Sequence, residues 1–322
     1  MTTITETAIP TPRRAVNDEM IAFAIMTVLL VAVPLTNIYP YFVMQALCFA
    51  LLACAFNLLI GYGGLLSFGH AMFLGTAGYC TAHALKIWGV SPELGILIGT
   101  AGAAALSVIT GLIAIRRQGI YFAMITLALS QLLYFVYLQT PFTHGEDGIQ
   151  GIPQGRLFGL LDLSDSTILY YVILAGFLFG FLVIYRAINS PFGEVLKAIR
   201  ENEPRAISLG YKTEQYKLMA YILSGTLAGL AGSLKVFVAQ NASLTDVHWT
   251  MSGEIVLMTL VGGLGTIFGP VVGAFVIIAM QQYLAGFGQW VTVIQGVIFV
   301  ICVLTFRRGV IGEIANFFKR SL

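Results

Sequence analysis

Long stretches of this sequence contain no Asp, Glu, Lys or Arg. The charge-free runs cover residues 20–85, 94–115, 118–145, 166–185, 218–234 and 255–306. Each run can hold one or more segments of about 20 apolar residues, the length that crosses a hydrocarbon core of roughly 30 Å. The runs are continuous and do not alternate as barrel strands do, so the spanning segments must be helices. We therefore predict an all-α integral membrane protein.

Helix breakers and charge bias give the number of membrane segments. Breaks at Tyr39-Pro40 and at residues 61–64 divide the first run into three crossings, and the next four runs hold one each. The last run could hold two long crossings, or three short ones divided at GGLGTIFGP and at residues 285–288. The charges of the loops place the two ends of this run on opposite sides of the membrane, so an odd number of crossings is needed and three is favoured. The result is a polytopic bundle of about ten transmembrane or partly embedded helices.

Basic residues in short loops favour the cytoplasmic side of a membrane. They gather at Arg13 and Arg14, at Arg116 and Arg117, in the segment 186–217, and after Phe306. The loop 141–165 carries four acidic residues against one arginine, and we place it outside. Both termini are then cytoplasmic. The expected organisation is a tail over 1–19, a transmembrane domain over 20–306 and a second tail over 307–322. A cleaved signal peptide is disfavoured, because this assignment of the loops to the two sides of the membrane requires the first span to remain.

Sequence motifs of enzymes are missing. The chain has no GxxxxGK[ST] phosphate loop and no HExxH, and its four histidines stand apart from one another. Cys48, Cys54, Cys80 and Cys302 are scattered through apolar runs without the paired spacing of a metal site. We expect no enzymatic activity, no metal and no cofactor bound by this chain.

A glycine-rich motif occurs twice in the apolar runs. Gly63-Gly64-Leu65 followed by Phe68-Gly69 returns, with one extra residue, as Gly262-Gly263-Leu264 followed by Phe268-Gly269. Matched glycine breaks in hydrophobic segments are typical of transport paths, because they free backbone groups that only a protein-lined or wet cavity tolerates. Close helix packing is the alternative, and we assign it to TLAGLAGS at 226–233. The candidate pathway residues are Asn57, Gly63, Gly64, Ser67, His70, Gly262, Gly263 and Gly265, although for His70 alone a structural role is favoured.

One long polar segment, residues 190–217, lies on the cytoplasmic side of the predicted topology. Ser190 with Pro191 predicts the start of one short helix, and Asn202 or Glu203 with Pro204 the start of another that Gly210 closes. Val195, Leu196 and Ile199 form an apolar stripe on the first helix. Such a helix pair either lies on the bilayer or docks into the groove of a partner, and its modest basic excess favours the partner.

Four sequence blocks together carry a family resemblance. They are GYGGLLSFGHAMF, THGEDGIQGIP at 143–153, the segment 190–232, and GGLGTIFGPVVGA at 262–274. In this order they resemble the permease subunits of branched-chain amino acid ABC importers, of the M type. The resemblance spans roughly residues 44–306.

This resemblance implies a channel in the bacterial inner membrane, usually built from two different permeases. It also implies two cytoplasmic ATPase subunits that hydrolyse ATP, a periplasmic substrate-binding protein, membrane lipid as surroundings and no nucleic acid. The segment 190–210 would couple to the ATPases through Gly193, Glu194, Arg200, Glu203, Ala206 and Gly210, although Pro204 and Ser208 depart from the family's pattern. Glu146, Asp147 and Gly148 would contact the binding protein.

The substrate stays open at this stage. Branched-chain or related amino acids are implied by the resemblance, and related permeases carry urea, short amides or aromatic acids. A stand-alone secondary transporter is the alternative of another class. Against it, Glu93 and Glu254 lie at the edges of apolar runs, whereas ion-coupled carriers place acidic groups in mid-membrane. An intramembrane enzyme is a third class, which the motifs do not favour.

Overall fold

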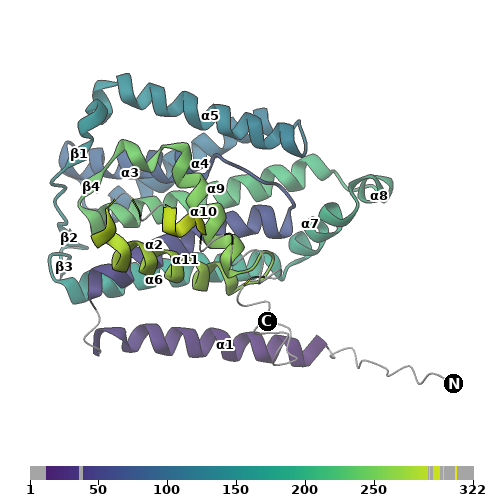
Figure 1. Ribbon diagram of the computed structural model, residues 1–322, viewed down its shortest axis with the longest axis horizontal. Coiled ribbons are helices and arrows are strands. Elements are labelled where there is room, and N and C mark those ends of the chain that lie inside the picture. Colours follow the sequence, from purple (N-terminus) through teal and green to yellow (C-terminus); the bar gives the residue numbers. More distant parts are fainter. Residues whose placement is uncertain are drawn as a thin grey trace.

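The computed structural model describes residues 12–35 and 39–288, and beyond them positions 290, 293–297, 300 and 309. Helices dominate this part of the chain (Figure 1). The α-helices are α1 (Pro12–Ala32), α2 (Pro40–Asn57), α3 (His70–Lys86), α4 (Pro92–Ala114), α5 (Ile120–Gln139), α6 (Ser166–Ile188), α7 (Pro191–Glu201), α8 (Glu203–Ser208), α9 (Thr213–Ala239), α10 (Trp249–Gly262) and α11 (Gly269–Leu284).

Short elements lie between these helices. A π-helical turn, η2 (Leu58–Tyr62), continues α2, and five 3-10 turns are η1 (Val33–Leu35), η3 (Pro141–Thr143), η4 (Gly145–Asp147), η5 (Leu244–Asp246) and η6 (Ala285–Phe287). The strands are β1 (Ile149–Gln150), β2 (Arg156–Leu157), β3 (Leu161–Asp162) and β4 (Asn241–Ala242). β1 pairs antiparallel with β4, with Ile149 opposite Ala242, and β2 pairs antiparallel with β3, with Leu157 opposite Leu161.

Helix length and composition confirm the predicted membrane protein. Within the described residues, five helical segments are long and apolar enough to cross a bilayer: Pro40–Tyr62, Pro92–Ala114, Ile120–Gln139, Ser166–Ile188 and Thr213–Ala239. Ile21–Ala32, α10 and α11 are shorter apolar helices. The chain is thus an all-α, multi-pass membrane protein, as the charge-free runs predict.

The helix α2 forms the centre of the bundle. In its most apolar stretch of 18 residues, 89% of the residues are buried, whereas the corresponding value is 22% for α5. α2 packs against α6, α9, α10 and α11, and α3, α4 and α9 pack on one another. α5 and α1 lie at the outside of the bundle (Figure 1). A central helix buried on all sides has no polar face, and between Pro40 and Leu59 of this sequence only Gln45 and Asn57 have strongly polar side chains.

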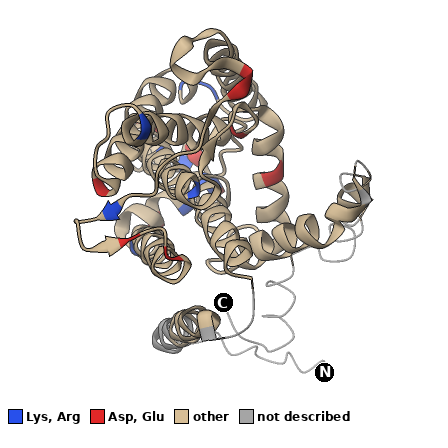
Figure 2. Cartoon of the chain, turned by 90° about the vertical axis from the view of Figure 1, so that its left-hand side faces the viewer, with Lys and Arg blue, Asp and Glu red and all other residues tan. Residues whose placement is uncertain are grey.

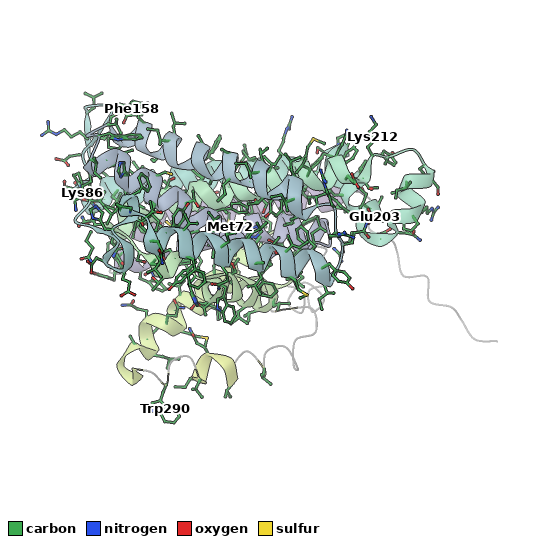
Figure 3. The ribbon with its side chains drawn as sticks, turned by 90° about the horizontal axis from the view of Figure 1, so that it is seen from above. Met72, Lys86, Phe158, Glu203, Lys212 and Trp290 are labelled. Carbon is green, nitrogen blue, oxygen red and sulfur yellow. The ribbon has the colours of Figure 1, made fainter. Side chains whose placement is uncertain are left out.

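The two polar loops lie at opposite ends of the bundle. The strands β1 to β4 lie at one end of the long axis and α7 and α8 at the other (Figure 1). Seen from above, Glu203 and Lys212 mark one end and Lys86 and Phe158 the other (Figure 3). The view along the bundle shows how few Lys, Arg, Asp and Glu side chains it carries (Figure 2). This separation agrees with the prediction that loops 141–165 and 186–217 face opposite sides of the membrane.

The helices are interrupted where the sequence predicts breaks. α2 begins at Pro40, residues 63–69 separate η2 from α3, residues 263–268 separate α10 from α11, and η6 follows α11. α1 begins at Pro12, so the predicted tail 1–19 contains the first turns of this helix. Most of the predicted crossing after Gly288 lies outside the described residues, as do Cys302 and, apart from position 309, the predicted tail 307–322.

Candidate functional site

The side chain of Asn57 joins the two glycine breaks. Asn57 is the last residue of α2 and is only 2% exposed. Its Nδ2 donates to the carbonyl oxygen of Thr266 at 2.8 Å, and its Oδ1 accepts from the backbone N–H of Gly265 at 3.0 Å. Backbone groups at a helix break need such partners, and a side chain is one source of them. The structure therefore brings together two breaks about 200 residues apart in the sequence.

The first break, residues 63–69, is held by backbone hydrogen bonds and by side chains. The N–H groups of Gly63, Gly64 and Leu65 donate to carbonyls of η2 at 3.1 Å. The chain leaves α2 through the π-helical turn η2, a wide form of helix that is frequent at functional sites. Gly64 follows with a φ of +68°, a left-handed conformation that favours glycine. The N–H of Phe68 then donates to Thr126 Oγ1 at 3.1 Å, and the N–H of Gly69 to Ser67 Oγ at 3.2 Å.

The helices on either side of the second break, residues 263–268, meet through direct backbone contact, while Asn57 holds Gly265 and Thr266. A Cβ atom placed on Gly262 would lie 1.9 Å from the carbonyl oxygen of Gly269, and one on Gly273 would lie 1.8 Å from that of Met258. Only glycine allows α10 and α11 to approach so closely. Gly263 and Gly265 also have positive φ angles, of 123° and 75°. Both explanations of the sequence motif thus apply here, because the glycines break the chain and also allow close packing.

Two cavities border these breaks within the described residues. Gly64 lines an apolar cavity of about 440 Å³ that lies between the first break and the beginning of α5, with Phe68, Ile120 and Leu127 on its walls. Gly265 lines a smaller cavity of about 240 Å³, whose other walls are Tyr62, Lys197, Arg200 and Glu201. Of the predicted pathway residues, these two glycines therefore border open space in the single chain.

His70 and Ser67 are enclosed in the core, with no exposed surface. His70 Nε2 lies 2.8 Å from Ser224 Oγ, and that hydroxyl donates to the carbonyl of Ala55 at 2.5 Å. Since the hydroxyl hydrogen is used there, Nε2 of His70 is the donor to Ser224. The rings of Phe56 and Phe73 meet His70 edge-on, with centroids 5.0 and 5.9 Å away. These contacts favour the structural role for His70.

The polar segment forms the two short helices that its caps predict. Asn202 Oδ1 accepts from the N–H of Arg205 at 3.1 Å and caps α8, and Gly210 ends it with a φ of +88°. Ser190 precedes α7 but does not cap it, because its hydroxyl donates back to the Ala187 carbonyl at 2.7 Å. The expectation for the apolar stripe needs correction. Leu196 and Ile199 are buried against the chain's own bundle, so they are not free for a partner or for lipid.

The six predicted coupling residues separate into buried and accessible groups. Gly193 and Ala206 are buried, and a Cβ on Gly193 would lie 2.0 Å from the Ile188 carbonyl. Glu203 forms an ion pair of 2.5 Å with the buried Lys217, which fastens α8 to α9. Arg200 is exposed, and its Nη1 donates to the Gly61 carbonyl. Glu194 and Gly210 are exposed.

The end of α8 and the residues that follow it expose apolar side chains that the sequence reasoning missed. Ile207 is 56% exposed, Leu209 is 69% exposed and Tyr211 is 41% exposed. They follow one another at every second position, which is not a helical spacing, so a search for helical stripes did not find them. We call Ile207, Leu209 and Tyr211 the tip patch.

The opposite loop is fastened to the bundle. Glu146 and Asp147 are exposed, but Gly148 is buried with a φ of +64°, and a Cβ there would lie 2.4 Å from the Ala242 carbonyl. Pairing of β1 with β4 and a 2.6 Å hydrogen bond from Lys86 Nζ to the Gln150 carbonyl hold the loop further. Two carboxylates therefore stand on a fixed base, and Gly148 is part of that base.

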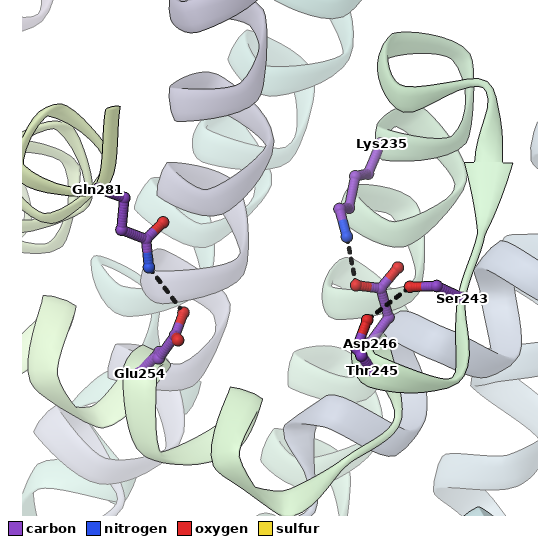
Figure 4. A network of polar contacts seen from close by, with 6 residues as sticks. All are labelled: Lys235, Ser243, Thr245, Asp246, Glu254 and Gln281. Atoms are coloured by element: carbon purple, nitrogen blue, oxygen red, sulfur yellow. Dashed lines mark hydrogen bonds and ion pairs between the residues drawn. The ribbon is translucent and has the colours of Figure 1, made fainter. Parts of the chain in front are cut away.

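A network of polar side chains near this end was also missed (Figure 4). Lys235 of α9 forms an ion pair with Asp246 of η5, and both side chains are largely buried. The Lys235 ammonium also lies 5.6 Å from the Phe49 ring. On α10, Glu254 accepts a 3.1 Å hydrogen bond from Gln281 of α11. Lys235 ends a charge-free run in the sequence, but VFVA follows it, and this apolar continuation signals that the helix goes on.

A comparison with protein families decides the identity. The family described as the permease component of the branched-chain amino acid transport system matches residues 38–304. The chain belongs to this family. Membership confirms the predicted function as a permease subunit of an ATP-binding cassette importer, and the predicted all-α polytopic fold.

Individual relatives agree with the family. The high-affinity branched-chain amino acid transport system permease protein LivM of Escherichia coli is 27% identical over 82% of this chain and 67% of its own length. A probable branched-chain amino acid transport permease protein LivH of Methanocaldococcus jannaschii is 28% identical over 80% of this chain and 86% of its own. The autoinducer 2 import system permease protein LsrC of Salmonella typhi is 30% identical over 44% of this chain and 41% of its own. No solved structure matches the chain.

Proposed function

We propose that this permease forms, with a second permease subunit, the membrane channel of an importer for branched-chain or closely related amino acids. Two cytoplasmic ATPase subunits hydrolyse ATP, and a periplasmic binding protein delivers the substrate. The chain lies in the bacterial inner membrane with both termini and α7–α8 in the cytoplasm. The family match over residues 38–304 carries this proposal, and relatives named for branched-chain amino acid transport, which match about four-fifths of the chain, support the substrate class.

The tip patch is the surface that best fits an ATPase subunit. Exposed apolar side chains that gather at a polar end of a membrane protein mark a place where a partner binds. Leu209 and Ile207 are more than half exposed, while Glu203 and Leu196 fasten α8 and α7 to the bundle. A firmly attached helix pair with an apolar tip transmits a push from a partner, because the helices cannot bend away from the load.

The exposed carboxylates of Glu146 and Asp147 are the corresponding surface for the binding protein. They lie at the opposite end of the bundle from the tip patch, on the loop that β1 and β4 fix. A fixed acidic pair favours a partner with a basic rim, and such contacts mainly accelerate association and weaken with salt.

The substrate path follows from the same arrangement. Where helices break, free N–H groups near a helix N-terminus favour a carboxylate, and free carbonyls favour an ammonium group. α3 and α11 both begin at a glycine break, at His70 and Gly269; both starts are buried in the single chain, so a substrate reaches them only in an opened state. A zwitterionic amino acid fits this pattern. Urea or a short amide fits it through hydrogen bonds alone and an aromatic acid through its carboxylate, so a competition series among these solutes identifies the cargo.

Copurification from mild detergent tests the proposal. Tagged wild-type chain is expected to bring an ATPase with it, and Leu209→Asp to lose that ATPase, because a charge replaces the most exposed side chain of the tip patch. Phe158→Asp is the matched control, since Phe158 is also apolar and 70% exposed but lies at the opposite end. Wild-type chain that comes down alone, or Leu209→Asp that keeps the ATPase, would contradict the proposal.

A further inference from the structure

We propose that Arg200 is a positioning residue that ties α7 to the two glycine breaks, so that a movement of α7 moves both breaks together. This inference rests on the proposed function, because it gives the route by which an ATPase stroke at α7–α8 would reach the transport path. The route consists of contiguous contacts: Arg200 to Gly61, Gly61 to Asn57, and Asn57 to Gly265 and Thr266.

The first contact joins the cytoplasmic helix to the first break. Nη1 of Arg200 donates to the carbonyl oxygen of Gly61, which belongs to η2. Carbonyls in the last turn of a helix lack intrahelical partners, so a guanidinium satisfies a group that the break leaves free. The stem of Arg200 also packs on Gly64, where a Cβ atom would lie only 3.1 Å from Arg200 Cγ. Arg200 thus holds the backbone on both sides of Tyr62.

The second contact joins the two breaks. A Cβ atom on Gly61 would lie 2.3 Å from Asn57 Oδ1 and 2.8 Å from the Gly265 nitrogen, so Gly61 packs directly on this junction. Asn57 then bonds to Gly265 and to Thr266. Coupling through packed and hydrogen-bonded groups requires such a continuous path. Here every step from α7 to the second break is a direct contact.

The surroundings of Arg200 allow it to transmit movement. Gly193, Leu196 and Ile199 bury one face of α7, so this helix is carried as a unit. A cavity of about 240 Å³ lies beside Arg200 and is lined also by Lys197 and Glu201. Lys197 lies three residues earlier on the same helix and borders the same cavity, but its ammonium pairs with Glu194 at 2.8 Å and lies 5.9 Å from the centroid of the Tyr62 ring. It is therefore a matched control for a cation at this cavity.

The experiment measures uptake per ATP hydrolysed, in proteoliposomes that contain the permease pair, the ATPases and the binding protein. Arg200→Gln is expected to lower this ratio by about tenfold, a value in the range that residues along coupled networks contribute, while the ATPase still copurifies. Lys197→Gln is expected to keep the wild-type ratio. Arg200→Lys keeps the positive charge but not the guanidinium, and its uptake per ATP is expected to lie between those of Arg200→Gln and Lys197→Gln. A wild-type ratio in Arg200→Gln would overturn the inference.

A second measurement keeps the inference testable if Arg200→Gln does not assemble. Spin labels at Ala198→Cys on α7 and Leu264→Cys in the second break report whether the two move together in otherwise wild-type complexes. The inference expects their separation to stay the same in the nucleotide-free and ATP-trapped states. A separation that changes between the states would overturn it. Failure of the proposed function is distinguishable, because wild-type complexes would then show no ATP-dependent uptake at all.

Discussion

The two glycine breaks share a sequence pattern but are stabilised differently. In the second break, glycines let α10 and α11 touch backbone to backbone, with virtual Cβ atoms at 1.9 and 1.8 Å from carbonyl oxygens. In the first break, N–H groups bond to carbonyls of η2 and to the hydroxyls of Thr126 and Ser67, and the Arg200 stem packs against Gly64. Backbone atoms cannot move aside for an added methyl group, whereas a flexible side chain can. The comparison teaches that the second break tolerates an added side chain least.

The largest effect is expected for Gly262→Ala in the second break. The added methyl group would lie 1.9 Å from the Gly269 carbonyl, which belongs to the backbone of α11 and has no free direction to shift. We expect loss of the folded protein, measured as an aggregated or absent peak in size-exclusion chromatography in detergent. Gly253→Ala on the same helix has open space around it and serves as the control. If Gly262→Ala and Gly253→Ala gave the same elution profile, the claim that backbone contact stabilises the second break would be contradicted.

The second-largest loss of stability is expected for Asn57→Ala. This change leaves the half-buried N–H of Gly265 and the half-buried carbonyl of Thr266 without this partner. Each unsatisfied group costs roughly 1–3 kcal/mol. The melting temperature of the purified permease should therefore drop clearly. Asn57→Ala with the stability of the wild type would show that the breaks do not depend on this link.

A smaller effect is expected for Gly64→Ala in the first break. A residue with a side chain at a φ of +68° costs roughly 1–2 kcal/mol, and the new methyl group would also meet the Arg200 stem at 3.1 Å. Gly89→Ala has nearly the same φ, +63°, with nothing within 4 Å, and separates strain from contact. Both variants should lose similar stability. Only Gly64→Ala should lower uptake per ATP, and a loss in Gly89→Ala as well would assign the effect to strain.

The smallest effect is expected for Gly69→Ala. Its new methyl group would meet the end of the Met72 side chain at 3.0 Å, and a flexible thioether can move aside. The expected change in the free energy of unfolding is within about 0.5 kcal/mol. Gly269 is the counterpart in the second break, where a Cβ would lie 2.7 Å from the Gly263 carbonyl. Equal losses in Gly69→Ala and Gly269→Ala, measured by thermal unfolding, would remove the distinction between the breaks.

The parts of the fold that follow from local chemistry were predictable. Charge-free runs, Tyr39-Pro40, the Asn202 cap and Gly210 each act within a few residues, and the helices begin and end accordingly. The echo of the glycine motifs pointed to two related breaks, and Asn57 was among the candidates. Its hydrogen bonds to Thr266 and Gly265 were not predictable, because nothing in the sequence gives the register between segments so far apart.

The remaining differences arise where a pattern has more than one physical outcome. An apolar stripe on α7 predicts that one face is covered, but not that the chain's own bundle covers it. Glu203 matched a surface motif, yet its carboxylate pairs with Lys217, fourteen positions later. Lys235 and Asp246 form their ion pair only because η5 folds back on α9. In each case tertiary packing, which one sequence does not show, chooses between the alternatives.

Uptake of labelled leucine into proteoliposomes tests the central claim most directly. The vesicles contain the permease pair, the ATPases and the binding protein, with and without ATP, and the sodium and proton gradients are collapsed. The account predicts uptake that requires both ATP and the binding protein. Uptake by the chain without ATP, driven by a sodium or proton gradient, would contradict it and identify a secondary transporter.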